Sequence, residues 1–237
     1  MEKNDLKKSL RNVFRKEIKY VITRREFYRI SDRLDAVMQR DSHGTNGTYN
    51  IRSLYFDSLS DRDFHDNLDG VMEKRKIRIR IYDLADENAL LEYKCKSGSD
   101  SRKKSLVITR EEAMALERRS FAPLLFHDEE LAAFLYNKMT QNVYQPRTIV
   151  VYDRTAFTYP VSDVRVTFDH NIMGSLSPFG LFDEHVPLYP LMEMGYGVLE
   201  VKYNEFLVSP IARIIADIDH LPIANSKYSD ARFLAYG

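Results

Sequence analysis

The sequence has little that would cross-link the chain, anchor it in a membrane or give it a net electric field. Its 237 residues contain one cysteine and no tryptophan, and 35 Lys and Arg residues balance 35 Asp and Glu residues. With Cys95 alone, an internal disulfide and a thiolate zinc site are excluded. A neutral chain has no general attraction for nucleic acid, so we expect no nucleic-acid partner.

Long apolar segments and low-complexity tracts are also missing. The longest apolar run, residues 131–136, is far below the length that spans a bilayer. The residues after Met1 are mostly charged and polar, unlike a signal sequence. The nine glycines and eight prolines are dispersed, without a linker or an internal repeat. We therefore expect one domain over residues 1–237, located in the cytoplasm.

Helix signals are few but well marked. Thr23 and Thr109 each precede a Glu by three residues, which is the pattern of a capping box at a helix start. Helical spacing of apolar residues predicts a further helix near Asp128, and the Ser-Pro pair at 209–210 predicts another. A short helix is expected near Ser229.

Between these helices the hydrophobic period changes to two, which is typical of β-strands. Strands and helices do not alternate regularly, so we expect an α+β protein with a mostly antiparallel sheet. The expected strands number about eight and cover residues 14–22, 49–57, 73–83, 89–97, 103–109, 147–158, 163–170 and 197–204.

Charged residues occupy every second position of several expected strands. One such strand usually has a solvated face, but Arg78 and Arg80, or Lys94 and Lys96, would repel each other unless an anion lay between them. Tyr20, the residue after Lys19, falls on the opposite face, and this segregation argues against stacking of single-stranded nucleic acid. The charged positions are Arg15, Glu17, Lys19, Arg78, Arg80, Glu92, Lys94, Lys96, Lys104, Arg154, Arg165, Glu200 and Lys202.

A sheet closed into a barrel would place these side chains in a narrow lumen. Arginine forks and lysine ammonium groups bind phosphate oxygens, so such a lumen would hold several phosphoryl groups in a row. Carboxylates beside phosphates call for a bridging cation, which makes Glu200, Glu17 and Glu92 candidate Mg²⁺ or Mn²⁺ ligands. For Glu17 and Glu92, simple pairing with a neighbouring cation is an equally good interpretation.

At these residues the sequence resembles the VTC domain, the polyphosphate polymerase family within the triphosphate tunnel metalloenzymes, which also include CYTH-type triphosphatases. The resemblance spans nearly the whole chain. The segments that carry it are Arg-Lys-Glu-Ile-Lys-Tyr at 15–20, Ser-Leu-Tyr-Phe-Asp at 53–57, Asn-Leu-Asp-Gly at 67–70, Lys-Ile-Arg-Ile-Arg-Ile-Tyr at 76–82, Leu-Glu-Tyr-Lys at 91–94, Asp-Arg-Thr-Ala-Phe at 153–157 and Val-Leu-Glu-Val-Lys at 198–202.

The resemblance implies an eight-stranded antiparallel β tunnel barrel with a basic lumen, flanked by helices. It implies a metal ligand at Glu200 and a lysine that closes over the tunnel at Lys227. A second family lysine, three residues earlier, is replaced here by Ala224. The family's phosphate-binding positions correspond to Lys19, Arg78, Arg80, Lys94, Lys104, Arg154 and Arg165.

The resulting expectation is a metal-dependent phosphotransferase that moves the γ-phosphate of ATP to inorganic polyphosphate. A metal-dependent triphosphatase and a non-catalytic sensor of polyphosphate or nucleotide are the alternatives, and a membrane-protein partner is compatible with any of them. Lys19, Arg78, Arg80 and Lys94 are expected to hold the triphosphate, and Arg154 and Arg165 the acceptor. Further substrate contacts are expected from Arg15, Lys96, Lys104, Lys202 and Lys227.

Overall fold

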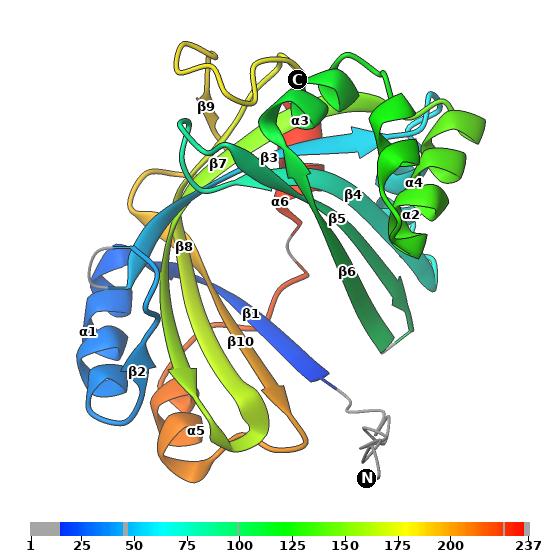
Figure 1. Ribbon diagram of the computed structural model, residues 1–237. Coiled ribbons are helices and arrows are strands. Elements are labelled where there is room, and N and C mark those ends of the chain that lie inside the picture. The colour runs from blue at the N-terminus through cyan, green and yellow to red at the C-terminus, as the bar shows by residue number, and fades with distance from the viewer. Residues whose placement is uncertain (1–14, 45–46, 99, 225, 235–237) are drawn as a thin grey trace, which may run out of the picture.

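The computed structural model describes residues 15–44, 47–98, 100–224 and 226–234 (Figure 1). These residues build one curved sheet with helices packed around it. The strands are β1 (Arg15–Thr23), β2 (Gln39–Arg40), β3 (Thr48–Asp57), β4 (Glu73–Ile81), β5 (Asn88–Ser97), β6 (Asp100–Thr109), β7 (Gln145–Tyr159), β8 (Val164–Gly174), β9 (Tyr189–Pro190) and β10 (Tyr196–Asn204). The helices are α1 (Arg24–Asp35), α2 (Arg62–Leu68), α3 (Arg110–Glu117), α4 (Glu130–Gln141), α5 (Ser209–Ala216) and α6 (Lys227–Phe233), with short 3₁₀ turns η1 (Ala122–Phe126) and η2 (Val161–Asp163).

The sheet is antiparallel throughout, as the alternating pattern predicts. Its main path runs β1-β10-β8-β7-β3-β4-β5-β6, with the short strands β2 and β9 added to β7 and β8. The expected closed eight-stranded barrel is not seen, because within the described residues β1 and β6 do not pair with each other. Part of the free edge of β1 is used differently: Ile223, in the segment between α5 and α6, donates its backbone N–H to the carbonyl of Lys19 over 2.9 Å.

The helix starts follow local capping chemistry. Thr23 and Thr109 both form the complete capping box, so α1 and α3 begin where the sequence predicts. The predicted helices near Asp128 and near Ser229 are present as α4 and α6, and α5 begins at Ser209 with Pro210 in its first turn. None of the described helices is long and apolar enough to cross a membrane.

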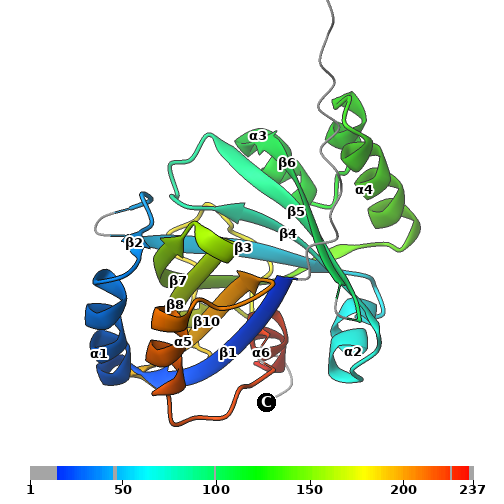
Figure 2. The same ribbon diagram turned by 90° about the horizontal axis from the view of Figure 1, so that it is seen from below.

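Two apolar cores cover the convex face of the sheet. One lies beneath α1 and α5, which pack side by side in Figures 1 and 2. Its centre is the ring of Phe27 stacked on Phe168, with centroids 4.0 Å apart. The other core lies beneath α3, η1 and α4, against the apolar side of β3, β4, β5 and β6. Because every second residue of each strand is buried in these cores, the intervening residues all point toward the concave face.

Helix α6 packs against one end of the concave face. Tyr228 is buried there, stacked on Tyr55 of β3 at 5.2 Å between centroids. Its hydroxyl donates to the buried carboxylate of Asp57, which also accepts the backbone N–H groups of Asp63 and Phe64 at the start of α2. One carboxylate therefore fixes both helices at this end of the concave face.

Gly197 of β10 is required by packing under α1. A Cβ atom at this position would lie 2.6 Å from two ring carbons of Phe168 and 2.7 Å from the carbonyl oxygen of Asp169. Gly195, two residues earlier, has a φ of +90° but no neighbour within 4 Å of such a Cβ. The two glycines of this Gly-Tyr-Gly segment are therefore explained by different constraints.

We expect Gly197→Ala to lower the free energy of unfolding by about 2–3 kcal/mol, because the added methyl group must displace the Phe27–Phe168 stack. Gly195→Ala should cost only roughly 1 kcal/mol, from its backbone conformation alone. Urea denaturation of both variants measures the difference. Equal losses would contradict the packing explanation.

Candidate functional site

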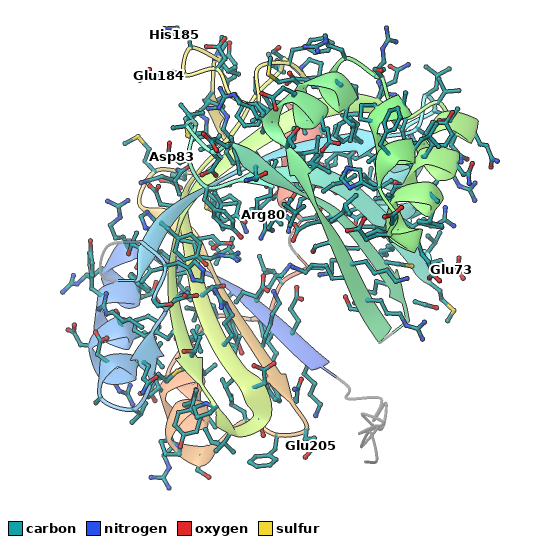
Figure 3. All side chains as sticks on the ribbon, viewed as in Figure 1. Glu73, Arg80, Asp83, Glu184, His185 and Glu205 are labelled. Atoms are coloured by element: carbon teal, nitrogen blue, oxygen red, sulfur yellow. The ribbon has the colours of Figure 1, made fainter. Side chains whose placement is uncertain are left out.

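The sheet register gathers charged side chains on the concave face. Adjacent strands place them opposite each other: Lys19 faces Glu200, Lys202 faces Arg165, Asp169 faces Arg154, and Arg78 faces Glu92. Arg80, labelled in Figure 3, lies inside the curve of the sheet, whereas Glu73, Glu184 and Glu205 lie at the periphery. The alternating charged residues therefore lie together on the concave face of the sheet and do not form an ordinary solvated face.

Glu92 of β5 organises the first group of cations. Its carboxylate is 2% exposed and accepts hydrogen bonds from Arg78 Nε at 2.6 Å and Lys103 Nζ at 2.9 Å, with Arg80 at 3.2 Å. Burial alone would raise the pKa of Glu92, but the attraction of Arg78 and the hydrogen bond from Lys103 outweigh burial and lower the pKa. One negative charge thus holds three positive ones, and the excess can bind an anion.

Glu17 and Glu200 form a second group with three lysines. Glu17 lies 3.0 Å from Lys19, 3.6 Å from Lys94 and 3.8 Å from Lys202, and Glu200 pairs with Lys202 and, at 3.9 Å, with Lys19. The contact between Glu17 and Lys94 joins the edge strand β1 to β5, the strand next to the opposite edge of the sheet. The curvature therefore brings side chains together even though the edge strands are not paired.

Both carboxylates in this second group are stabilised as anions. Burial would raise the pKa of Glu17, but Lys202, Lys19 and Lys94 lower it to about 2. The pKa of Glu200 is also lowered, because Lys202 and Lys19 outweigh burial and the repulsion of Glu17. Two neighbouring ionised carboxylates on one face are available at neutral pH.

Asp169 of β8 is the centre of a third group. It is fully buried and binds Arg154 in a bidentate pair, at 2.6 and 2.8 Å, and Lys227 of α6 at 2.7 Å. The ring of Tyr152 lies beneath both cations, 4.9 Å from Lys227 Nζ and 5.4 Å from the guanidinium carbon of Arg154. Asp169 therefore orients the ammonium group of Lys227. Asp169 was not predicted from the sequence as a site residue, although alternation along β8 places it on the same face as Arg165.

Lys76 of β4, which was not predicted from the sequence as a site residue, lies among these cations. Its ammonium group donates to Ser226 Oγ at 2.6 Å. Burial, together with the repulsion of Lys19, Lys94 and Arg78, lowers the pKa of Lys76 to about 7. Burial is the larger cause, and the three neighbouring cations add to it, so an anion bound at this point of the concave face would favour the charged form of Lys76.

Arg165 marks the opposite end of the concave face from α6. It donates to Asp41 Oδ2 at 2.5 Å and to the hydroxyl of Tyr49 at 2.9 Å. His43 also bonds to Asp41, through its other carboxylate oxygen. Arg165 is thus separate from the Asp169 group that holds Arg154.

The expected direction of one side chain, that of Lys104, is corrected. Lys104 pairs with Tyr93 in the register and points to the outer face, whereas Lys103 faces Lys94 and reaches Glu92. Consecutive residues of a strand alternate between faces, so only the pairing with β5 decides which lysine points inward. Lys96 is exposed near the end of β5, and the side chain of Arg15 lies outside the described part of the chain.

The expected separation of aromatic and charged residues also fails. Tyr49, Tyr55 and Tyr152 lie on the concave face among the cations, as the contacts of Tyr55 with Arg78 and of Tyr152 with Arg154 show. Separation of faces therefore gives no argument against base stacking in this protein.

The donor set agrees with a metal ion that is held partly by substrate. Among the described residues, no three His, Cys, Asp or Glu side chains cluster as a ready-made metal cage. Mg²⁺, however, commonly uses one or two carboxylates and takes its other ligands from phosphates and water. The ionised pair Glu17 and Glu200 fits that description. Glu92 fits it less well, because three cations lie within 3.2 Å of its carboxylate, whereas Lys94 and Lys202 lie 3.6 and 3.8 Å from Glu17.

Comparison with known proteins agrees with this arrangement. A family model described as the VTC domain matches residues 14–236. A "putative adenylate cyclase" from Bacillus halodurans has a similar structure, with 12% sequence identity, a TM-score of 0.51, and coverage of 90% of this chain and 94% of that one. The PH1819 protein from Pyrococcus horikoshii OT3 is 12% identical, with a TM-score of 0.48 over 94% of this chain and 99% of that one. At these identities the likeness concerns the fold alone, and no curated protein sequence matches the chain.

The carboxylates of the concave face should make the fold sensitive to acid. Their pKa values are lowered on folding, so their ionised forms stabilise the fold above the ordinary carboxyl range and lose that contribution as the pH falls toward about 2, the pKa of Glu17. We expect the free energy of unfolding to decrease between roughly pH 5 and pH 2.5. Urea denaturation at a series of pH values measures it.

Glu17→Gln should make this pH dependence shallower. Glu184→Gln, at an exposed loop position, is the matched control and should leave the slope unchanged. An unchanged slope in Glu17→Gln would mean that the three lysines do not stabilise the charge of Glu17.

Proposed function

The chain belongs to the VTC domain family, and from this membership and its charged concave face we propose that it transfers the γ-phosphate of ATP to a growing inorganic polyphosphate chain. The observation that carries the proposal is the convergence of cations from seven strands and α6 on one face, where buried carboxylates orient them. A linear chain of phosphates is the anion whose shape and charge match that distribution.

The residues divide into a donor region and an acceptor region. Arg78, Arg80 and Lys103, held by Glu92, bind the oxygens of the triphosphate. Lys19 and Lys94 continue this surface toward β1. Positioning and charge neutralisation of this kind supply most of the acceleration in phosphoryl transfer.

Arg154 and Lys227, beside Asp169, bind the end of the acceptor chain. The terminal oxygens of polyphosphate are already ionised at neutral pH, so the acceptor needs no general base. Glu200 and Glu17 would hold the Mg²⁺ or Mn²⁺ ion, which would neutralise charge on the triphosphate oxygens.

A metal-dependent triphosphatase is the second candidate, and one contact favours it. Asp169 already neutralises part of the charge on Arg154 and Lys227, and Ala224 stands where the family resemblance implies another lysine. A weakly held acceptor would leave water as the competing nucleophile.

Incubation with ATP and Mn²⁺ distinguishes the candidates. ADP together with an acid-precipitable polymer supports the polymerase. Stoichiometric release of orthophosphate without polymer would overturn it in favour of the triphosphatase. Saturable ATP binding without turnover would identify a sensor instead.

Glu200→Gln tests the proposed metal ligand. The amide keeps the shape of the side chain but removes the charge that a divalent cation requires, so we expect turnover to fall by at least roughly a hundredfold. The melting temperature should also fall, with the fold retained, because Lys202 and Lys19 lose their buried partner. Enzyme assays with Mn²⁺ and a melting curve measure the two effects. Near-normal turnover would place the metal elsewhere.

Lys103→Ala and Lys104→Ala form a matched pair on consecutive residues of β6. Lys103 reaches the Glu92 group, whereas Lys104 points to the outer face. We expect Lys103→Ala to raise the Kd of tripolyphosphate roughly tenfold, in keeping with the loss of a charge-assisted hydrogen bond. Lys104→Ala should leave it within about twofold. Calorimetric titration of both variants gives the answer, and the reverse order would contradict the register of β6.

A further inference from the structure

Aromatic rings gather on the concave face next to the proposed triphosphate cations. Tyr49 of β3 and Tyr82, immediately after β4, meet edge to face with centroids 6.0 Å apart. The ring of His43 lies 5.8 Å from that of Tyr49. Tyr82 is 40% exposed and the side chain of His43 is 72% exposed, so neither ring is part of an apolar core.

The position of these rings is fixed relative to the cations. Tyr82 follows Arg80 by two residues and lies on the same face, about 7 Å farther along the strand direction. Tyr49 faces Arg154 in the register between β3 and β7, and its hydroxyl accepts a hydrogen bond from Arg165. A ligand that binds Arg78 and Arg80 through phosphates would therefore meet Tyr82 as it leaves the phosphate-binding surface.

The setting of Tyr82 differs from that of an ordinary surface tyrosine. Burial raises the pKa of its hydroxyl, and its position two residues after Arg80 places the ring on the face that carries Arg78 and Arg80. Tyr49 is oriented by Arg165 and contacts Tyr82 edge-on. One ring is therefore fixed, and the other keeps an exposed surface beside it.

We propose that Tyr82, supported by Tyr49, forms a nucleobase-binding subsite that makes a nucleoside triphosphate, rather than inorganic triphosphate, the preferred donor. Bases stack on aromatic side chains with little dependence on base identity, so the subsite would recognise the presence of a base. This inference rests on the proposed function, because it assumes that Arg78 and Arg80 bind the phosphates.

Tyr82→Leu tests the subsite by comparing two ligands. The probes are a non-hydrolysable ATP analogue and inorganic tripolyphosphate, each titrated calorimetrically with Mg²⁺ present. Loss of one stacking contact should raise the Kd of the analogue at least roughly fivefold. The Kd of tripolyphosphate should stay within about twofold of that of the parent chain.

Two control variants separate stacking from other effects. Tyr82→Phe keeps the ring and should bind both ligands as the parent does, which would exclude a role for the hydroxyl. Tyr28→Leu makes the matched change at an exposed tyrosine of α1, on the convex side, and should change neither Kd. Melting curves of all variants confirm that each one is folded.

The outcomes separate this inference from the proposed function. A Tyr82→Leu chain that binds the analogue normally, or that loses both ligands equally, overturns the subsite. If the analogue alone is weakened but the parent makes no polymer, the subsite stands and the polymerase proposal fails. If the parent binds neither ligand, both proposals are overturned.

Discussion

Repulsion between like charges on one curved face is the constraint to which the rest of the structure responds. Arg78, Arg80 and Lys103 would separate in water, but the buried carboxylate of Glu92 holds all three. Asp169 does the same for Arg154 and Lys227. The compensation is incomplete, because each of these single carboxylates is shared by two or three cations. The concave face therefore keeps an excess of positive charge, which a bound chain of phosphates would neutralise.

Apolar burial in the two convex cores offsets the free-energy cost of gathering charges on the concave face. Helices α1 and α5 cover one half of the sheet, and α3, η1 and α4 cover the other. Between these halves the curvature brings Glu17 of β1 within 3.6 Å of Lys94 of β5. An ion pair thus connects the edge strand β1 with β5, the strand next to the other edge, where backbone pairing is absent.

Features that depend on residues close together in the sequence could be predicted, whereas features that depend on distant segments could not. Capping boxes at Thr23 and Thr109 are local, and they predicted the starts of α1 and α3. Two-residue alternation predicted that Arg78 and Arg80 share a face. It did not distinguish Lys103 from Lys104, because both lie in one basic run and only the register with β5 orients them. Nor did it predict Tyr49 beside Arg165, or the open edge between β1 and β6, since both depend on the packing of distant segments.

In the proposed reaction, the balance between polymer growth and hydrolysis would depend on the group around Asp169. An incoming phosphate must compete with this carboxylate for Arg154 and Lys227, whereas the triphosphate meets three cations that share the single charge of Glu92. Helix α6 cannot shift freely to relieve the competition, because the hydroxyl of Tyr228 is bound to the buried Asp57. In that reaction the donor would be bound more strongly than the acceptor, and the occupancy of the acceptor region would decide whether the γ-phosphate meets polyphosphate or water.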